Sequence, residues 1–167
     1  VADIVLIGAK SEIDALVAEY GLKNIDKATI VESENNPNAQ KYADLLFKLR
    51  EKKGMTPEKA AELVKDPLYL GTLIIKSGEA DGQVAGARNT TGDVLRPALQ
   101  IIKTAPGISC VSGAFIMILE NEAAKAYGKE GILVFADCAV TPNPDAKRLG
   151  QIAVCSADTA HDIAGIE

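Results

Sequence analysis

The chain has 167 residues, of which 47% are hydrophobic and 25% charged; this is the composition of a folded globular protein and excludes disordered and collagen-like classes. Its 18 Lys and Arg residues against 23 Asp and Glu give a net charge of −5, so the positive field that nucleic acids require is absent and no nucleic-acid partner is expected. No apolar run reaches the roughly 20 residues of a bilayer-spanning helix, so no membrane partner is expected either.

The N-terminal residues and the cysteines favour a cytoplasmic location. Residues 1–8 lack the basic region and the cleavage site of a signal peptide. Cys110, Cys138 and Cys155 form no CxxC pair, and an odd number of cysteines fits a reducing compartment better than a disulfide framework. We therefore expect a cytoplasmic protein with free thiols.

The first half of the chain alternates β-branched runs with apolar residues at helical spacing. The Thr56-Pro57 pair is a strong helix start, because a hydroxyl can cap the helix and proline suits its first position. The expected elements are a strand over residues 4–7, a helix from Ser11, a strand over 29–32, and helices over 39–53, from Thr56 and over 68–76.

The second half continues the alternation. The expected elements are a strand over 82–85, a helix over 93–103, strands over 109–119 and 131–137, and a closing helix over 145–164. Strands that alternate with helices are typical of βαβ units. The pattern therefore predicts an α/β fold, a layered and largely parallel sheet flanked by helices.

The most informative segment precedes and opens the helix predicted over 93–103. Pro97 restricts the helix start to about Asp93, and the apolar periodicity turns Arg96 away from the core. The hydroxyls of Thr90 and Thr91 lie just before this start, where free backbone amides attract anions. The segment is a candidate phosphate site, but helix capping by either threonine explains the same residues.

Arg50 is a second candidate for phosphate binding. It follows Leu46 by one helical turn, so its guanidinium can reach from the edge of the buried face into a neighbouring cleft. Arginine suits forked contacts with phosphate oxygens. Alternatively, Arg50 belongs to a basic helix end with Lys48 and Lys52 that merely complements the helix dipole.

The sequence does not favour phosphate-loop, dinucleotide-binding or nucleophile-elbow enzymes, or enzymes with a metal site or a cysteine nucleophile. The sequence contains no GxxxxGK[ST], GxGxxG or GxSxG motif. His161 is the single histidine, which argues against a multi-histidine metal site, and no metal is expected. Cys138, after Asp137 at the end of a predicted strand, could be a nucleophile, but no histidine is near in sequence and an unreactive buried thiol is favoured.

Three segments, residues 2–8, 80–107 and 134–144, resemble phosphate acetyltransferases of the phosphate acetyl/butyryltransferase family. The resemblance implies reversible transfer of an acetyl group between coenzyme A and inorganic phosphate, with acetyl phosphate as the product or substrate. It implies no metal and no cofactor other than coenzyme A as a substrate. It also implies a homodimer and two α/β domains similar to those of isocitrate dehydrogenase.

The resemblance assigns roles to residues of this chain. The family's helical arginine for coenzyme A or substrate corresponds to Arg50, its arginine before proline corresponds to Arg96, and Thr90 and Thr91 occupy hydroxyl positions that face phosphate. Residues 1–107 correspond to most of the first domain without its opening strand and helix, and residues 108–167 to the beginning of the second.

The family's catalytic serine, arginine and aspartate are expected beyond residue 167. In the mechanism that the resemblance implies, the aspartate takes the proton of the coenzyme A thiol and the thiolate attacks the carbonyl of acetyl phosphate. The reaction is direct and needs no cysteine on the enzyme. Two alternatives remain open: a phosphate butyryltransferase, or a catalytically silent α/β binding module.

Overall fold

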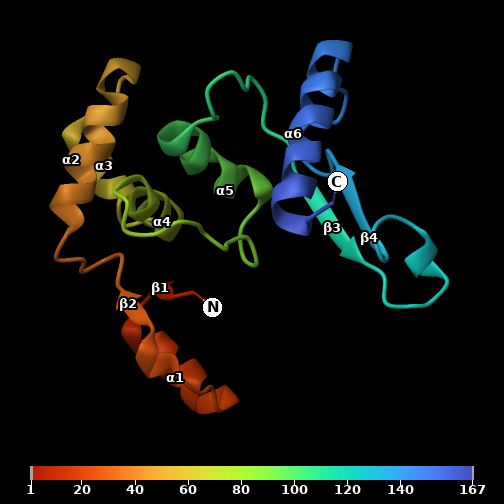
Figure 1. The fold of residues 1–167 in the computed structure, drawn as a ribbon. Helices are drawn as coiled ribbons and strands as arrows, with labels where there is room; N and C mark the ends of the chain where they lie inside the picture. Colours follow the sequence, from red (N-terminus) through yellow and green to blue (C-terminus); the bar gives the residue numbers. More distant parts are fainter. Residues whose placement is uncertain (1, 167) are drawn as a thin grey trace. The chain divides into compact units, whose positions relative to one another are not determined.

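The computed structural model describes residues 2–166 and separates into two compact units, the first ending at Lys103 and the second beginning at Thr104 (Figure 1). The predicted domain boundary after residue 107 lies close to this division and stays a prediction. Within the described range, no helix has both the length and the apolar character needed to cross a membrane.

The first unit opens with a parallel strand pair. Strand β1 (Val5–Ile7) pairs with β2 (Thr29–Val31), and helix α1 (Lys10–Tyr20) connects them, which confirms the strand, helix and strand predicted for this segment. The carboxylate of Glu32 accepts a hydrogen bond of 2.9 Å from the backbone N–H of Lys10. A negative charge at this position favours the N-terminus of α1 through the helix dipole.

Three helices follow, and local capping signals define where the second and third begin. They are α2 (Ala39–Arg50), extended by a 3-10 turn over Glu51–Lys53, α3 (Pro57–Leu63) and α4 (Pro67–Lys76). The Thr56 side chain accepts from the backbone N–H of Lys59, and the Asp66 carboxylate accepts from that of Leu68. All three predicted helices are confirmed, and in α3 and α4 the cap and the proline act within the first helical turn.

The hydrophobic core of the first unit forms around α4. This helix is apolar on all sides and packs against α2, α5 and the turn that follows α5 (Figure 1). A helix that is hydrophobic all round is stable only when it is enclosed. The fully buried side chains around it include Leu46, Val64, Leu70, Leu73 and Ile101.

The segment after α4 differs from the prediction in two places, the helix that contains Pro97 and the strand predicted over 82–85. Helix α5 (Thr91–Pro97) begins at Thr91 rather than Asp93 and continues as a π-helical turn, η3 (Ala98–Ile102), closed by a hydrogen bond from Lys103 N–H to the Ala98 carbonyl. Proline has no N–H to donate to the preceding turn, so the regular helix pattern breaks here.

The strand predicted over 82–85 is wrong. These residues form neither a strand nor a helix within the described range, and Gln83 lies against α4. A Cβ at Gly71 would come within 3.0 Å of the Gln83 side chain, so the glycine makes this approach possible. The Thr72 hydroxyl also donates to the Gln83 side-chain carbonyl at 3.3 Å. The local sequence has strand propensity, but no partner strand lies beside it.

In the second unit, strands β3 (Ala114–Ile118) and β4 (Ile132–Ala136) pair antiparallel, and helix α6 (Ala146–Ala164) packs on both. The expectation of a largely parallel sheet is therefore wrong for this pair. A parallel return requires a crossover, usually a helix of a dozen or more residues, and the connection contains only the 3-10 turn Ala124–Ala126. Taken together, the described residues have an α/β fold with two small sheets.

A single carboxylate organises the loop after β4. Asp137 accepts hydrogen bonds from the backbone N–H groups of Gly113 at 3.1 Å, Ala139 at 3.3 Å, Val140 at 3.1 Å and Thr141 at 2.8 Å. Partial burial opposes ionisation, but these four donors outweigh it and hold the pKa of Asp137 below its usual range. The ionised carboxylate thus ties the start of β3 to the end of β4.

We expect Asp137→Asn to destabilise the protein by about 1 to 3 kcal/mol at neutral pH, because one carbonyl cannot replace two charged oxygens. Since the folded pKa is depressed, this stabilisation is complete above the unfolded pKa and disappears as the pH falls through the folded value, so the two proteins converge below about pH 4. Urea unfolding at several pH values measures the difference in stability between the wild type and the variant, and Asp158→Asn, at an exposed position, is the control. Equal midpoints for both variants at pH 7 would contradict the role.

Candidate functional site

Two residues predicted to bind phosphate from the sequence meet at one cavity of the first unit. The cavity has a volume of about 290 Å³ and is lined by both Arg50, the last residue of α2, and Arg96, from α5. The rest of its wall comes from residues 53–55, which follow α2, and from α3, α4 and η3. The helix packing around α4 therefore brings together two arginines that are far apart in the sequence.

The cavity has a strongly positive lining. Besides the two arginines, Lys53 and Lys59 line it, and no Asp or Glu does. The remaining wall is apolar or neutral, including Met55 and Leu63. Four cationic side chains around a small cavity attract anions, and guanidinium groups match the geometry of phosphate oxygens.

Arg50 carries a polar atom without a partner. Its Nε is buried and makes no hydrogen bond within the described residues. Buried polar atoms are nearly always paired, so an unpaired guanidinium nitrogen beside a cavity indicates a missing acceptor. The preceding turn of α2 is anchored by Leu46, which is fully buried. Arg50 thus lines a cavity at the edge of the buried face of α2, and its role in phosphate binding stays a prediction.

Arg96 is held only loosely. Its Nη2 lies 3.4 Å from Oδ1 of Asp93, and the arginine side chain is 60% exposed. An exposed and long ion pair of this kind contributes little to stability, so the guanidinium can turn toward another anion. Its exposure confirms that Arg96 faces away from the core.

Sequence reasoning missed two residues of the cavity, Tyr69 and Gln100. Tyr69 is only 6% exposed, and its hydroxyl donates to the side-chain carbonyl of Gln100 at 3.1 Å. Burial raises the pKa of Tyr69, while the positive charges of Arg96 and Arg50 partly oppose the rise. Both side chains were hidden within apolar periodic runs, so the pattern offered only a structural role for them.

Thr90 and Thr91 do not line this cavity. The Thr90 side chain accepts from the backbone N–H of Asp93 at 3.2 Å, and its hydroxyl donates to the Asp93 carboxylate at 2.7 Å, which together form a capping box. These bonds, the side-chain one first, hold the pKa of Asp93 below its usual range. The capping alternative is thus confirmed for Thr90, while Thr91 is the exposed first residue of α5.

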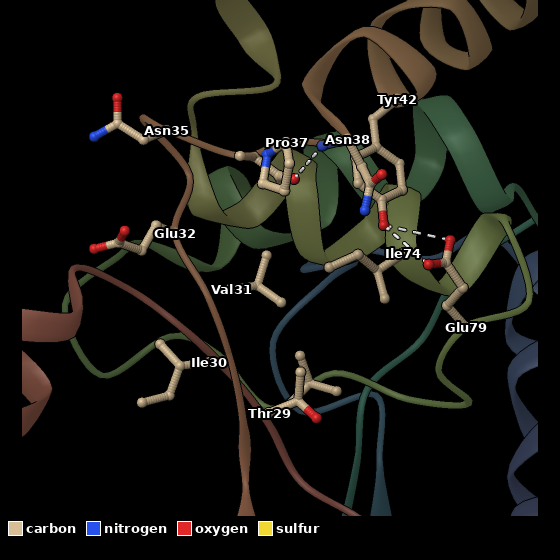
Figure 2. Close-up of a pocket in the computed structure, with 12 residues that line it drawn as sticks. Thr29, Ile30, Val31, Glu32, Asn35, Pro37, Asn38, Tyr42, Ile74 and Glu79 are labelled. Carbon is tan, nitrogen blue, oxygen red and sulfur yellow. Dashed lines mark hydrogen bonds between the residues drawn. The ribbon is translucent and has the colours of Figure 1, made fainter.

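A larger cavity of about 460 Å³ lies beside the carboxyl end of β2 (Figure 2). Its lining includes the carboxylates of Glu32 and Glu79 and no Lys or Arg, which is the wrong charge for phosphate. The buried Tyr42 hydroxyl donates to Glu79 at 3.2 Å, and Lys41 pairs with the same carboxylate at 2.7 Å. Burial, and then the charge of Glu79, raise the pKa of Tyr42. The Glu79 carboxylate therefore already has its partners, Tyr42 and Lys41, within the protein.

The candidates for metal binding and nucleophilic chemistry lie in the second unit. His161 is exposed and contacts Asp162, and among residues 2–166 no group of three or more His, Cys, Asp or Glu could hold a metal ion. Cys138 is a half-buried free thiol beside the Asp137 loop, and the single histidine of the chain, His161, contacts Asp162. Neither residue belongs to the cationic cavity.

Comparison with known proteins gives a consistent family. The family model described as "Phosphate acetyl/butaryl transferase" matches residues 1–167. The chain is 47% identical to the phosphate acetyltransferase of Clostridium acetobutylicum over 99% of its own length and 49% of the relative's, and 47% identical to that of Thermoanaerobacterium thermosaccharolyticum over 100% and 49%. It therefore spans about half the length of these relatives.

A solved structure is also similar to this chain. A crystal structure of a phosphotransacetylase from Streptococcus pyogenes superimposes with a TM-score of 0.82 at 37% sequence identity. The match covers 95% of this chain and 45% of that one. The backbone arrangement described here is thus one already observed experimentally in a related protein.

If Thr90 acts as the helix cap, Thr90→Val should destabilise the protein by about 1 kcal/mol, because the acceptor for the Asp93 amide is lost. Thr90→Ser keeps the hydroxyl and should be nearly neutral. Equilibrium unfolding in urea measures the difference, with Thr91→Val as the matched control. A Thr90→Val variant as stable as Thr91→Val would show that the cap contributes nothing.

Proposed function

This chain belongs to the phosphate acetyl/butaryl transferase family, and from that premise we propose that it forms part of an enzyme that moves an acetyl group reversibly between coenzyme A and inorganic phosphate. The cationic cavity then binds a phosphoryl group of coenzyme A, of acetyl phosphate or of inorganic phosphate. Arg50 and Arg96 are its principal contacts. Thr90 and Thr91 are additional phosphate contacts proposed from the family resemblance alone.

The observation that carries this proposal is the convergence of the two arginines on one cavity without acidic residues. The phosphoryl groups of the proposed substrates are multiply charged and offer several acceptor oxygens, so they match paired guanidinium forks with lysines nearby. The unpartnered Nε of Arg50 supplies one donor for such an oxygen.

The chemical step itself is assigned to residues outside this chain. By resemblance, an aspartate of the remaining half removes the thiol proton of coenzyme A, and the thiolate attacks the acetyl carbonyl. The bond between the carbonyl carbon and the phosphate oxygen breaks, and phosphate leaves. A serine and an arginine of that half stabilise the developing negative charge. Coenzyme A is a substrate in this scheme, and no metal or other cofactor takes part.

The wider context is proposed on the same basis. Residues 1–107 would contribute most of a first α/β domain and residues 108–167 the beginning of a second, with an overall arrangement similar to that of isocitrate dehydrogenase. The enzyme would be a cytoplasmic homodimer. The parallel pair β1 and β2, with α1 between them, is the part of the described fold that supports this arrangement.

In the complete protein, Arg50→Ala and Arg96→Ala should each raise KM for coenzyme A or for acetyl phosphate by about tenfold or more, because a charge-assisted hydrogen bond to phosphate is lost. Lysine at either position should recover only part of the loss, since it lacks the fork. The assay is thioester formation from acetyl phosphate and coenzyme A. Arg148→Ala, an exposed arginine of α6, is the control. Changes below about threefold in both cavity variants would contradict the proposal.

The acyl group is tested by comparing acetyl phosphate with butyryl phosphate. The relatives described above carry the name phosphate acetyltransferase, so we expect acetyl to be preferred. Two additional methylenes change selectivity by about 1 to 3 kcal/mol, or roughly 5- to 150-fold in kcat/KM. A preference for butyryl phosphate would identify a butyryltransferase, and the absence of turnover with either substrate would favour a silent binding module.

A further inference from the structure

The Tyr69–Gln100 pair is not explained by the proposed phosphate contacts, although both side chains line the cationic cavity. Gln100 lies in the π-helical turn η3, between Pro97 and the fully buried Ile101. The buried neighbours hold the backbone of the turn, and the wider turn sets the position from which the Gln100 side chain leaves the helix. Such turns are frequently found at functional sites.

The hydrogen bond from Tyr69 determines which end of the Gln100 amide is free. The phenol donates its proton to the side-chain carbonyl oxygen at 3.1 Å. The Nε2 of Gln100, with two N–H donors, makes no hydrogen bond to any residue between 2 and 166. Because Tyr69 is buried against the core, its hydroxyl has a fixed position and the amide is held in one orientation.

We propose that Gln100 is a further binding residue of the cavity, that its amide N–H group donates to the bound phosphoryl oxygen, and that Tyr69 is a positioning residue that orients this amide. The inference rests on the proposed function, because it requires a phosphoryl group in the cavity. A neutral donor adds directionality to a site whose four cations attract any anion.

The surroundings of the Tyr69–Gln100 pair support this assignment. Tyr69 and Gln100 line the same cavity as Arg50 and Arg96, which places the pair within reach of the same anion as the two guanidinium groups. Burial keeps the phenol protonated at neutral pH, so the hydroxyl remains a donor to Gln100. A carboxylate at position 100 would keep the acceptor for Tyr69 but would repel an anion.

The experiment uses the complete protein and steady-state kinetics with coenzyme A and acetyl phosphate varied separately. We expect Gln100→Met, which keeps the length of the side chain, to raise one KM by about fivefold to tenfold while kcat changes less than twofold. Gln100→Glu should raise the same KM further. The substrate whose KM rises identifies the source of the phosphoryl group.

Tyr69→Phe tests the positioning role. It should raise the same KM by about threefold in the wild-type background and should have no further effect in Gln100→Met, because the two residues act through one amide. Loss of stability alone would not produce this coupling. Gln40→Ala and Tyr20→Phe, both exposed and outside the cavity, are the controls, and urea unfolding verifies that every variant folds.

Three outcomes decide the matter. If Arg50→Ala raises KM but Gln100→Met and Gln100→Glu do not, the inference is overturned while the proposed function stands. If the arginine variants are also without effect, the proposed function fails and the inference fails with it. If Gln100→Met raises KM but Tyr69→Phe is additive with it, the positioning role of Tyr69 is overturned.

Discussion

The enclosure of helix α4 is the constraint on which the first unit depends. Seven consecutive residues of this helix, from Leu68 to Ile74, are buried, and α2, α5 and η3 pack around it. The same packing brings the end of α2, which carries Arg50, close to Arg96 on α5. The candidate site is thus a consequence of core formation: apolar burial positions the cations, and the cations need no contact with each other.

Charge, more than size, distinguishes the two cavities of this unit. The larger one at the end of β2 contains carboxylates whose partners are already present, Tyr42 and Lys41 for Glu79 and the start of α1 for Glu32. The smaller one contains only cationic and neutral side chains and leaves the Nε of Arg50 unpaired. The buried Nε of Arg50 lacks an acceptor that an anion would supply, whereas the carboxylates of the larger cavity already have partners and the unpaired polar atom there, Nδ2 of Asn36, is neutral.

Elements defined by short-range signals were predicted well. The start of α3 follows from a cap and a proline within one turn, and α6 begins directly after the turn at residues 142–144 that separates it from β4. The pairing of strands was predicted less well, because it depends on residues distant in the sequence. Residues 82–85 have strand propensity but lie beside α4, and β3 and β4 pair antiparallel because no crossover helix separates them.

The sequence by itself determined the net charge, the buried helix faces and the two arginines as phosphate candidates, since residue type and local spacing carry that information, and its resemblance to known sequences indicated the family. Only the tertiary structure decided that Arg50 and Arg96 share a cavity, that Thr90 caps α5 and lies outside it, and that Tyr69 orients Gln100. Those relations depend on distances between separate elements. The packing around α4 sets these distances, and no local pattern encodes them.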